Sequence, residues 1–523
     1  MRKQLFTIAS LLVMASMALT ACGPQATPAA STPVTVEKTV VVAGTPQTVV
    51  VTATPETKAP AVFKSKDPTT FVEMTFGDPE TLDPALDYET AGSAVIQNVY
   101  DTLLWYKKDT TDLVPWLATE IPTTANGGIS ADGKTYKFKI RTGVKFHDGN
   151  DMKPSDIAFS LQRGLLQGGS ASPQWLMFEP VLGSGVGAGN NDITDLLDAD
   201  GSKKLIDDPA ALQKEDPAAL KAACEKVTAA IVADDAGNTL TFNLAQAWGP
   251  FNVTLAGSWA AVMEKSWVAS NGGWDGSCDT WQKFYGVTSD VINKTKIGTS
   301  EMGTGPYMLD HWTPTEEYVL KANENYWVKD AAWDGAPTGA PKLKTVTVKS
   351  VSEFSTRYAA LQAGDADMIT LGSTADWTQM DTLMGETCDT TTGTCTPSDK
   401  PDAQLRRFTG YYAPTHTDAF FQFKVDETGG NNFIGSGKLD GNGIPADFFS
   451  DVHVRKAFAY CFDWDTFIKD VMQGQGRQTL TLMLPGEPGY DANATHYTYD
   501  TEKCKSEFQA STWKAADGKS LWD

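Results

Sequence analysis

The sequence is poor in basic residues relative to acidic ones. It contains 43 Lys and Arg against 65 Asp and Glu, a formal net charge of -22 over 523 residues. This excess of negative charge opposes attraction to phosphate backbones and to anionic lipid headgroups. A nucleic-acid-binding role is therefore excluded, and any attachment to a membrane must depend on something other than basic residues.

Other features of enzymes and membrane proteins are also missing. Beyond the N-terminus there is no apolar run of about 18 residues, the length that a membrane-spanning helix needs. There is no Cys-x-x-Cys motif, no His-Glu-x-x-His motif and no Cys/His cluster with zinc spacing. We therefore expect no resident metal or cofactor. With 41% hydrophobic and 21% charged residues, most of the chain is expected to be globular, in about three structural units.

The N-terminus departs from this average. Arg2 and Lys3 precede an apolar run from Leu5 to Leu19, which is typical of an export signal. The run ends in Leu19-Thr-Ala-Cys22, which resembles the lipobox of bacterial lipoproteins. The resemblance implies that residues 1–21 are a signal peptide and that Cys22 is lipidated, which would hold the protein at the outer face of the cytoplasmic membrane or at the cell surface. An ordinary signal peptide that happens to contain a cysteine is the alternative.

Residues 22–66 are rich in Thr, Pro and Val. Two copies of Thr-Val-Val-Val begin at Thr39 and Thr48, and these could pair as strands. Prolines interrupt the stretch, so the composition favours an extended tether instead. These prolines include Pro33, Pro46, Pro55 and Pro60.

Six cysteines remain when Cys22 is set aside, an even number that suits the oxidising environment outside the cytoplasm. Cys388 and Cys395 bracket a short polar loop, so a local disulfide is expected between them. Proximity along the chain favours Cys224 with Cys278 and Cys461 with Cys504. Free buried thiols are the alternative for these last two pairs.

Periodicity indicates that strands and helices are mixed along the globular part. Tyr136, Phe138 and Ile140 alternate with charged residues, which predicts a strand with one buried face. A helix is predicted from Pro154, because Ile157, Leu161 and Leu165 then share one face. Together these patterns indicate an α/β protein with more than one lobe.

The later part of the chain repeats this alternation. Phe354, Tyr358 and Leu361 form a helical stripe that ends at Gly364, and a short strand is predicted at Met368-Ile369. Another helix is predicted to begin near Asp451, and Asp463 is placed to cap its successor, which would run as far as Gly474.

A long segment of this region resembles a known family. The stretch from Gly133 to Gly149, continued from Pro154 to Arg163, closely resembles the signature of the family 5 extracellular solute-binding proteins, the peptide- and nickel-binding receptors of ABC importers. Further motifs follow in the order that the family shows, and the resemblance extends from about residue 67 to the end. They are Glu80-Thr-Leu-Asp-Pro84, Tyr100-Asp-Thr-Leu-Leu-Trp105, Leu113-Val-Pro-Trp-Leu-Ala118, Gly303-Thr-Gly-Pro-Tyr307, Asn325-Tyr-Trp327 and Val454-Arg-Lys-Ala-Phe-Ala-Tyr460.

The resemblance implies a periplasmic-binding-protein-like type II fold, with two lobes, described as three domains, around a ligand cleft. It also implies a monomeric receptor that passes its ligand to a permease and ATPase complex. Family members continue past the point equivalent to Asp523, so we expect an incomplete second lobe. The expected domains are a first lobe at 67–112 and 297–410, an inserted domain at 113–296 and a second lobe at 411–523.

The candidate ligand-binding residues rest partly on the same resemblance. Glu89-Thr-Ala-Gly-Ser93 lies where family members present backbone and hydroxyl groups to ligand, and Thr90, Gly92 and Ser93 suit that role chemically. An ordinary turn before a helix over 94–100 is the alternative. Aromatic and basic candidates are Trp248, Trp259, Tyr411, Tyr412 and Arg477, for which packing in the core or solvation are the alternatives.

Two functional hypotheses follow. In the first, the chain is a lipid-anchored receptor that takes up a peptide or a similar small solute and does no covalent chemistry. In the second, it is a secreted glycoside hydrolase, or an oligosaccharide-binding protein, in which some of the 15 tryptophans hold a sugar. The first hypothesis is preferred, so we expect no catalytic residue.

Overall fold

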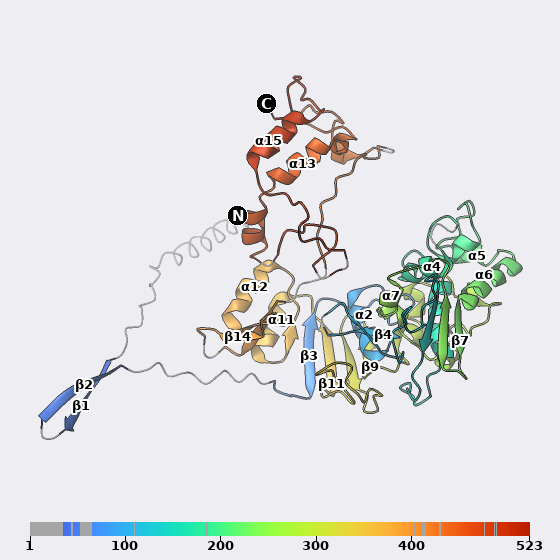
Figure 1. Cartoon of the computed structure of the whole chain (residues 1–523), viewed down its shortest axis with the longest axis horizontal. Coiled ribbons are helices and arrows are strands. Elements are labelled where there is room, and N and C mark those ends of the chain that lie inside the picture. The colour runs from blue at the N-terminus through green and yellow to red at the C-terminus, as the bar shows by residue number, and fades with distance from the viewer. Residues whose placement is uncertain are drawn as a thin grey trace, which may run out of the picture. The chain divides into compact units, whose positions relative to one another are not determined.

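The structure is a computed structural model of the chain (Figure 1). It describes residues 35–42, 45–52, 65–108, 110–183, 187–400, 403–410, 415–427, 430–474, 476–485, 487 and 489–522. The predicted signal peptide and Cys22 lie outside the described residues. The chain divides into two compact units, Met1–Ala61 and Val62–Asp523. Within the described residues, no helix is both long and apolar enough to cross a membrane.

The first unit contains a β-hairpin, so the prediction of an extended tether is wrong for this segment. Strand β1 (Thr35–Val42) pairs antiparallel with β2 (Thr45–Thr52). Three of the four prolines named above fall outside the strands, and Pro46 is the second residue of β2, opposite Val41. Each strand of a two-stranded ribbon keeps one edge unpaired, so a residue without an N–H is tolerated there.

The second unit begins with a five-stranded mixed sheet in the order β12-β3-β11-β10-β9. The first strand in sequence, β3, runs parallel to both β11 and β12, whereas β9, β10 and β11 pair antiparallel. Segments almost 300 residues apart in sequence therefore form one sheet, as Figure 1 shows for β3 and β11. The bounds are β3 (Thr70–Thr75), β9 (Tyr307–Thr313), β10 (Glu317–Ala322), β11 (Thr345–Ser350) and β12 (Met368–Ile369).

A second sheet forms within the predicted inserted domain, in the order β6-β8-β7. Strand β6 (Thr135–Lys139) alternates buried and exposed residues as predicted, with Tyr136 and Phe138 in the core. The predicted helix α3 (Pro154–Gln167) is also present, and Ile157, Leu161 and Leu165 are buried. The other elements packed with them are β7 (Ile231–Asp234), β8 (Thr239–Asn243), α4 (Trp175–Leu182) and α6 (Pro217–Ala230).

Short elements connect these sheets. Strand β4 pairs antiparallel with β5, and helix α2 packs against β9. The bounds are α2 (Thr90–Val99), β4 (Leu104–Tyr106), β5 (Leu113–Pro115), α5 (Pro209–Leu212), α7 (Phe251–Thr254), α8 (Lys265–Ser270), α9 (Ser289–Ile292) and α10 (Lys296–Thr299).

A third sheet follows β12. The predicted helix α11 (Phe354–Ala363) ends at Gly364, whose positive φ of 72° closes it. In the sheet, β13 lies between β14 and β15, antiparallel to the first and parallel to the second. The bounds are α12 (Thr374–Met380), β13 (Met384–Asp389), β14 (Thr394–Pro397) and β15 (Leu405–Thr409).

In the described C-terminal part, the longest regular elements are two helices joined by irregular chain. Asp451 caps α13 (Val452–Cys461), which packs against α15 (Thr501–Ala510). The helix predicted after Asp463 is a single α turn, α14 (Trp464–Thr466), followed by a π turn at Phe467–Val471. Val471 is 55% exposed and Phe467 is 39% exposed, so these apolar side chains are not buried here.

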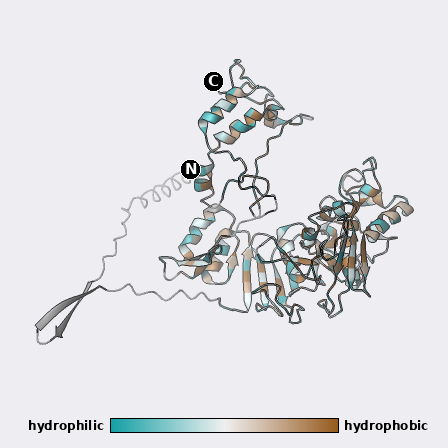
Figure 2. Ribbon diagram, viewed as in Figure 1, coloured by the Kyte–Doolittle hydropathy of each residue, from teal (hydrophilic) through white to brown (hydrophobic). Residues whose placement is uncertain are grey.

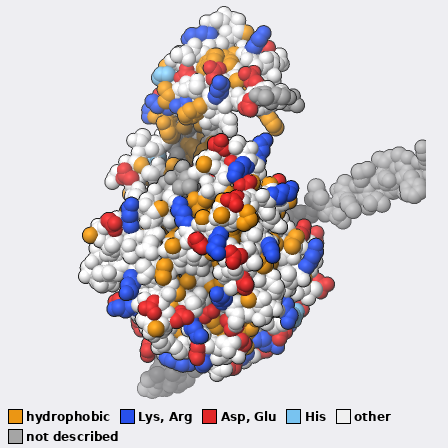
Figure 3. Space-filling view, turned by 90° about the vertical axis from the view of Figure 1, so that its right-hand side faces the viewer, with side chains coloured by type: hydrophobic (Ala, Val, Ile, Leu, Met, Phe, Trp, Pro, Cys, Tyr) orange, Lys and Arg blue, Asp and Glu red, His pale blue; other side chains and the backbone are white. Residues whose placement is uncertain are grey.

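Most of the apolar burial lies in one core that runs from α2 through the β6-β8-β7 sheet and its helices. Brown ribbon segments in Figure 2 follow these strands and helices. On the face drawn in Figure 3, acidic and basic side chains are interspersed among apolar ones. The buried core that begins at α2 supports the site described next.

Candidate functional site

The predicted ligand-binding segment forms the first turn of α2. The helix begins at Thr90, so the prediction that it starts near residue 94 is wrong. The physical reason is that Glu89 caps the helix. Its carboxylate accepts hydrogen bonds of 2.5 Å from the backbone N–H groups of Ala91 and Gly92. Thr90 is exposed, whereas Ser93 is half-buried and its hydroxyl contacts the buried side chains of Asp87 and Ser258.

Gly92 is required at its position because three oxygens crowd it. A Cβ at residue 92 would lie 2.1 Å from Asp87 Oδ1, 2.6 Å from Glu89 Oε1 and 2.8 Å from the carbonyl oxygen of Thr81. No side chain fits into that space. The backbone of α2 therefore approaches a buried carboxylate that the sequence analysis did not identify.

That carboxylate belongs to Asp87, which is 2% exposed. Its Oδ2 accepts a hydrogen bond of 2.8 Å from the Ser93 hydroxyl, whereas its Oδ1 has no partner. Burial raises the pKa of Asp87 to about 8, against the Ser93 hydrogen bond, and the charge of Glu89 adds to the rise. No sequence signal marked Asp87, because its neighbours Ser93, Glu89 and Glu80 meet in an irregular turn that follows no periodic pattern.

The predicted tryptophans pack against the core. Trp259 follows Ser258, whose hydroxyl lies 3.1 Å from that of Ser93, and its indole N–H donates to the Thr254 carbonyl. Trp248 is also partly buried, and its carbonyl accepts from the Tyr136 hydroxyl. Trp259 is therefore next in the chain to a residue that contacts α2, whereas no such link is seen for Trp248 in the described residues.

The remaining predicted residues are not placed in this site. Tyr411 and Tyr412 lie outside the described residues. Arg477 is exposed in the C-terminal part of the chain. Their roles stay predictions.

The motifs that carry the family resemblance converge on a second buried carboxylate, Asp101. It accepts hydrogen bonds from the indole N–H groups of Trp116 and Trp327 at 2.7 and 2.8 Å. It also accepts from the hydroxyls of Thr304 and Tyr326 at 2.7 and 3.1 Å. Four motifs far apart in sequence are therefore joined by one side chain, which is a structural role.

His147, from the same signature, is buried beside Glu301. Its Nδ1 lies 2.8 Å from Glu301 Oε2, and its Nε2 lies 3.0 Å from the carbonyl oxygen of Gly305. Burial alone would lower the pKa of His147, but the Glu301 hydrogen bond and charge outweigh it and raise the pKa. Both ring nitrogens face acceptors, so the imidazole is held as a charged donor within the scaffold.

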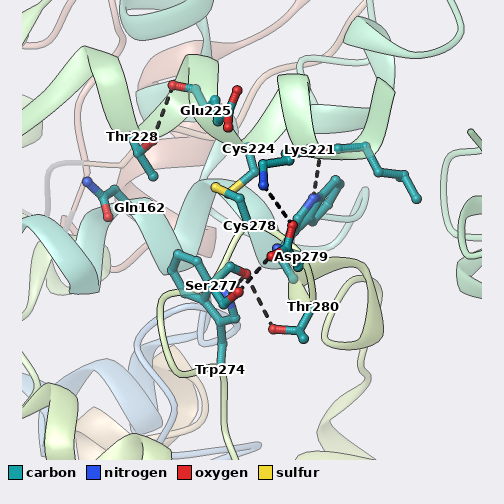
Figure 4. Close-up of a disulfide and its surroundings, with 12 residues drawn as sticks. Gln162, Lys221, Cys224, Glu225, Thr228, Trp274, Ser277, Cys278, Asp279 and Thr280 are labelled. Atoms are coloured by element: carbon teal, nitrogen blue, oxygen red, sulfur yellow. Dashed lines mark hydrogen bonds and ion pairs between the residues drawn. A yellow bond between two sulfur atoms is a disulfide. The ribbon is translucent and has the colours of Figure 1, made fainter. Parts of the chain in front are cut away.

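Three disulfides are present, in the pairs that proximity in sequence favoured, and free thiols are therefore not the state of these cysteines. Cys224 on α6 bonds to Cys278, and Figure 4 shows the Lys221–Asp279 ion pair beside it. Cys388 on β13 bonds to its register partner Cys395 on β14, and Cys461 on α13 bonds to Cys504 on α15.

Within the described residues, a group of possible metal ligands and a cavity both lie away from the start of α2. Glu386, Cys388 and Cys395 have the spacing of a ligand set, but both sulfurs are used in a disulfide and Glu386 pairs with Arg406 at 2.6 Å. A cavity of about 540 Å³ lies in the C-terminal part, lined by residues that include Phe433, Leu439, Ile444, Ala515 and Leu521. Neither feature contains a predicted ligand-binding residue.

The strands and helices define a mixed α/β fold, and the comparisons assign the chain to a family. The solved structure of the oligopeptide-binding protein AppA from Bacillus subtilis, in complex with a nonapeptide, has the same fold, with a TM-score of 0.50 at 16% identity, covering 88% of this chain and 67% of that one. Residues 112–522 match the sequence model described as bacterial extracellular solute-binding proteins, family 5 Middle. The chain belongs to this family.

Curated relatives agree with this assignment. The dipeptide-binding protein of Escherichia coli K12 is 24% identical over 89% of this chain and 67% of its own length. Heme-binding protein A of Haemophilus influenzae is 26% identical over 84% of this chain and 62% of its own length. The chain thus spans about two thirds of the length of these relatives.

Proposed function

We propose that this chain is the solute receptor of an ABC importer, which captures a dipeptide, an oligopeptide or a similar small solute and releases it unchanged. Membership of the extracellular solute-binding family supports the receptor role. In this chain the proposal is carried by the burial of the family's signature motifs around Asp101, and the exposed Thr90 in the first turn of α2 is the candidate contact to ligand.

We also propose that the ligand is enclosed by lobe closure and then passed to a permease and ATPase complex. The first lobe would comprise residues 67–112 and 297–410, with the inserted domain at 113–296, and residues 411–523 would belong to the second lobe. Closing two lobes removes the ligand from water, which strengthens each hydrogen bond to it. A monomer is sufficient for this cycle.

Attachment through Cys22 is part of the same proposal. The apolar run ending at Leu19-Thr-Ala-Cys22 would be cleaved, and lipid on Cys22 would hold an acidic protein at the outer face of the membrane. Phase partition in detergent tests this: the exported chain should enter the detergent phase, and the Cys22→Ala variant should stay in the aqueous phase. A Cys22→Ala variant that still enters the detergent phase would contradict the anchor.

A thermal-shift and mass-spectrometry experiment tests the receptor role. The chain is heated with a tryptic casein digest, with a set of oligosaccharides and with nickel, and each bound ligand is recovered and weighed. A receptor is expected to gain stability with the peptide pool and to return the peptides at unchanged mass. Recovery of hydrolysed products, or stabilisation by none of these solutes, would contradict the proposal.

A further inference from the structure

The β13–β14 hairpin places three possible metal ligands on one face of its sheet. Cys388 on β13 is the register partner of Cys395 on β14, and Glu386 precedes Cys388 by two residues on the same strand. Residues two apart on a strand share a face, and so do residues directly opposite each other on paired strands. One ligand atom from each of the three residues lies within 4.8 Å of the other two. The strand register therefore brings two sulfurs and a carboxylate together.

The third strand of this sheet orients the carboxylate. Arg406 on β15 is the register partner of Glu386, and its Nε lies 2.6 Å from Glu386 Oε2. The same carboxylate oxygen lies 3.6 Å from Cys388 Sγ. Glu386 is thus held beside the sulfurs by a residue outside the ligand group, as hydrogen-bonding partners hold the carboxylate ligands of metal sites.

The two sulfurs form a disulfide, so the group becomes a set of ligands only on reduction. Cys395 is exposed, as is the rest of β14, whereas Cys388 is 4% exposed. A thiolate of an external dithiol can therefore attack Cys395 Sγ, forming a mixed disulfide and expelling Cys388 as a thiolate. The second thiol of the reductant then displaces Cys395. The dithiol ends as a disulfide, and its two electrons and two protons end on the two cysteines.

The reduced hairpin has a spacing that suits a tetrahedral zinc ion. The Cβ atoms of directly opposed residues lie about 4.5 to 5.5 Å apart. Zn–S bonds of about 2.3 Å place two thiolates about 3.8 Å apart, which sulfurs on such Cβ atoms can reach. Two thiolates with a carboxylate favour Zn²⁺, since Cu⁺ prefers sulfur alone and Mg²⁺ and Ca²⁺ prefer oxygen. Each thiol loses its proton when it binds the ion.

We propose that the β13–β14 hairpin is a redox-gated zinc site whose ligands are Cys388, Cys395 and Glu386. The disulfide excludes the ion, because the thiolate is the form of cysteine that binds a metal. Reduction by a dithiol opens the site, and Zn²⁺ then keeps the sulfurs from pairing again. The inference does not depend on the proposed receptor function.

Competition with a coloured zinc chelator tests the site. The full chain is reduced with dithiothreitol, separated from the reagent in the absence of oxygen, and titrated with Zn²⁺. The reduced chain is expected to bind one Zn²⁺ that the oxidised chain does not bind. Cys395→Ser should abolish this binding, and Glu386→Gln should weaken it by at least about tenfold, a loss seen even for partners outside the ligand shell. Equal binding by the oxidised and reduced chains overturns the inference.

The disulfide between Cys461 and Cys504 provides the matched control. It also joins an exposed cysteine to a buried one, but in the described part of the chain no third ligand completes a group with these two. Cys461→Ser should therefore leave the binding of Zn²⁺ to the reduced chain unchanged. Loss of binding in this variant overturns the assignment of the site to the hairpin.

Alkylation of the reduced native chain locates the ion without any variant. The chain is treated with iodoacetamide in the presence and absence of Zn²⁺, and each modified cysteine is identified by peptide mass mapping. Zn²⁺ is expected to prevent modification of Cys388 and Cys395 and to leave that of Cys461 unchanged, because a thiolate bound to zinc is not available as a nucleophile. Equal protection of all the cysteines, or protection of none, overturns the inference.

Discussion

Asp87 and Asp101 are both almost fully buried, at 2% and 1% exposure, yet their surroundings are opposite. Asp101 accepts from four donors that come from distant motifs, whereas Asp87 accepts from one hydroxyl and leaves an oxygen without a partner. A buried carboxylate with all its partners stabilises a fold, and one that lacks partners does not. The family signature thus marks the scaffold, and the less satisfied carboxyl marks the candidate site.

The largest effect is expected at Asp101. Asp101→Ala leaves two indole N–H groups and two hydroxyls without their acceptor, and each unpaired buried donor costs on the order of 1 kcal/mol or more. We expect a loss of about 4 kcal/mol in the free energy of unfolding, measured by urea denaturation. Asp112→Ala, an exposed residue nearby, is the control and should change it by less than about 0.5 kcal/mol. A similar loss in the free energy of unfolding for the two variants would contradict the structural role of Asp101.

The buried His147–Glu301 pair gives the next largest effect. His147→Leu leaves Glu301 buried without its partner, at a cost of about 3 kcal/mol. Because the pKa of His147 is raised in the folded state, its contribution is complete below about pH 6.5 and is lost as pH rises through the folded pKa. Urea denaturation between pH 6 and pH 9 should show this decline in the native protein. A decline of equal size in the variant would contradict the assignment.

Asp451 provides a smaller effect in the C-terminal part. Burial alone would raise its pKa, but hydrogen bonds from Thr512, His453 and Ser511 outweigh burial and lower it to about 2. The stabilisation is therefore present above about pH 4 and is lost as pH falls toward 2. Asp451→Ala removes the cap of α13 and should cost about 1 to 2 kcal/mol at pH 7. Denaturation at pH 7 and at pH 3 checks this, since the difference between variant and native protein should shrink at pH 3.

The smallest effect is expected at Asp87. Its pKa of about 8 lies above that of the unfolded chain, so the folded state holds the proton more tightly and stability falls as pH rises from about 4 to 8. Asp87→Asn imitates the protonated side chain. It should change the free energy of unfolding by less than about 1 kcal/mol at pH 4, where the side chain is protonated in the folded state, and should flatten the fall between pH 4 and pH 8. A large loss at pH 4 would place Asp87 with Asp101, in the scaffold.

Local patterns predicted much of the scaffold. The alternation around Phe138 and the stripe of Ile157, Leu161 and Leu165 gave the strand β6 and the helix α3, because each pattern reflects burial of one face of one element. The disulfide pairs followed from proximity along the chain. The start of α2 was missed because a Glu side chain is not a typical helix cap. The β1–β2 hairpin was missed because proline was expected to prevent strand pairing, yet Pro46 lies within the paired register.

The site was predicted only in part, for a physical reason. Thr90, Gly92 and Ser93 were identified through the resemblance. Ser258 meets Ser93 through a contact between segments 165 residues apart, and Asp87 meets it through the irregular turn before α2. No periodicity in the sequence reports which hydroxyl donates to which carboxylate. Trp248 was chosen for its chemistry, and its place in the fold is explained by packing against the core.

The link between Cys224 and Cys278 has a consequence for proteolysis of this chain. The two cysteines are 54 residues apart, and the segment between them includes the exposed turn after β7. A single nick in that segment leaves both fragments covalently joined, so the nicked molecule migrates as one species until a reducing agent is added. Cleavage in this segment is therefore hidden from non-reducing electrophoresis, which does not resolve the one water molecule that hydrolysis adds.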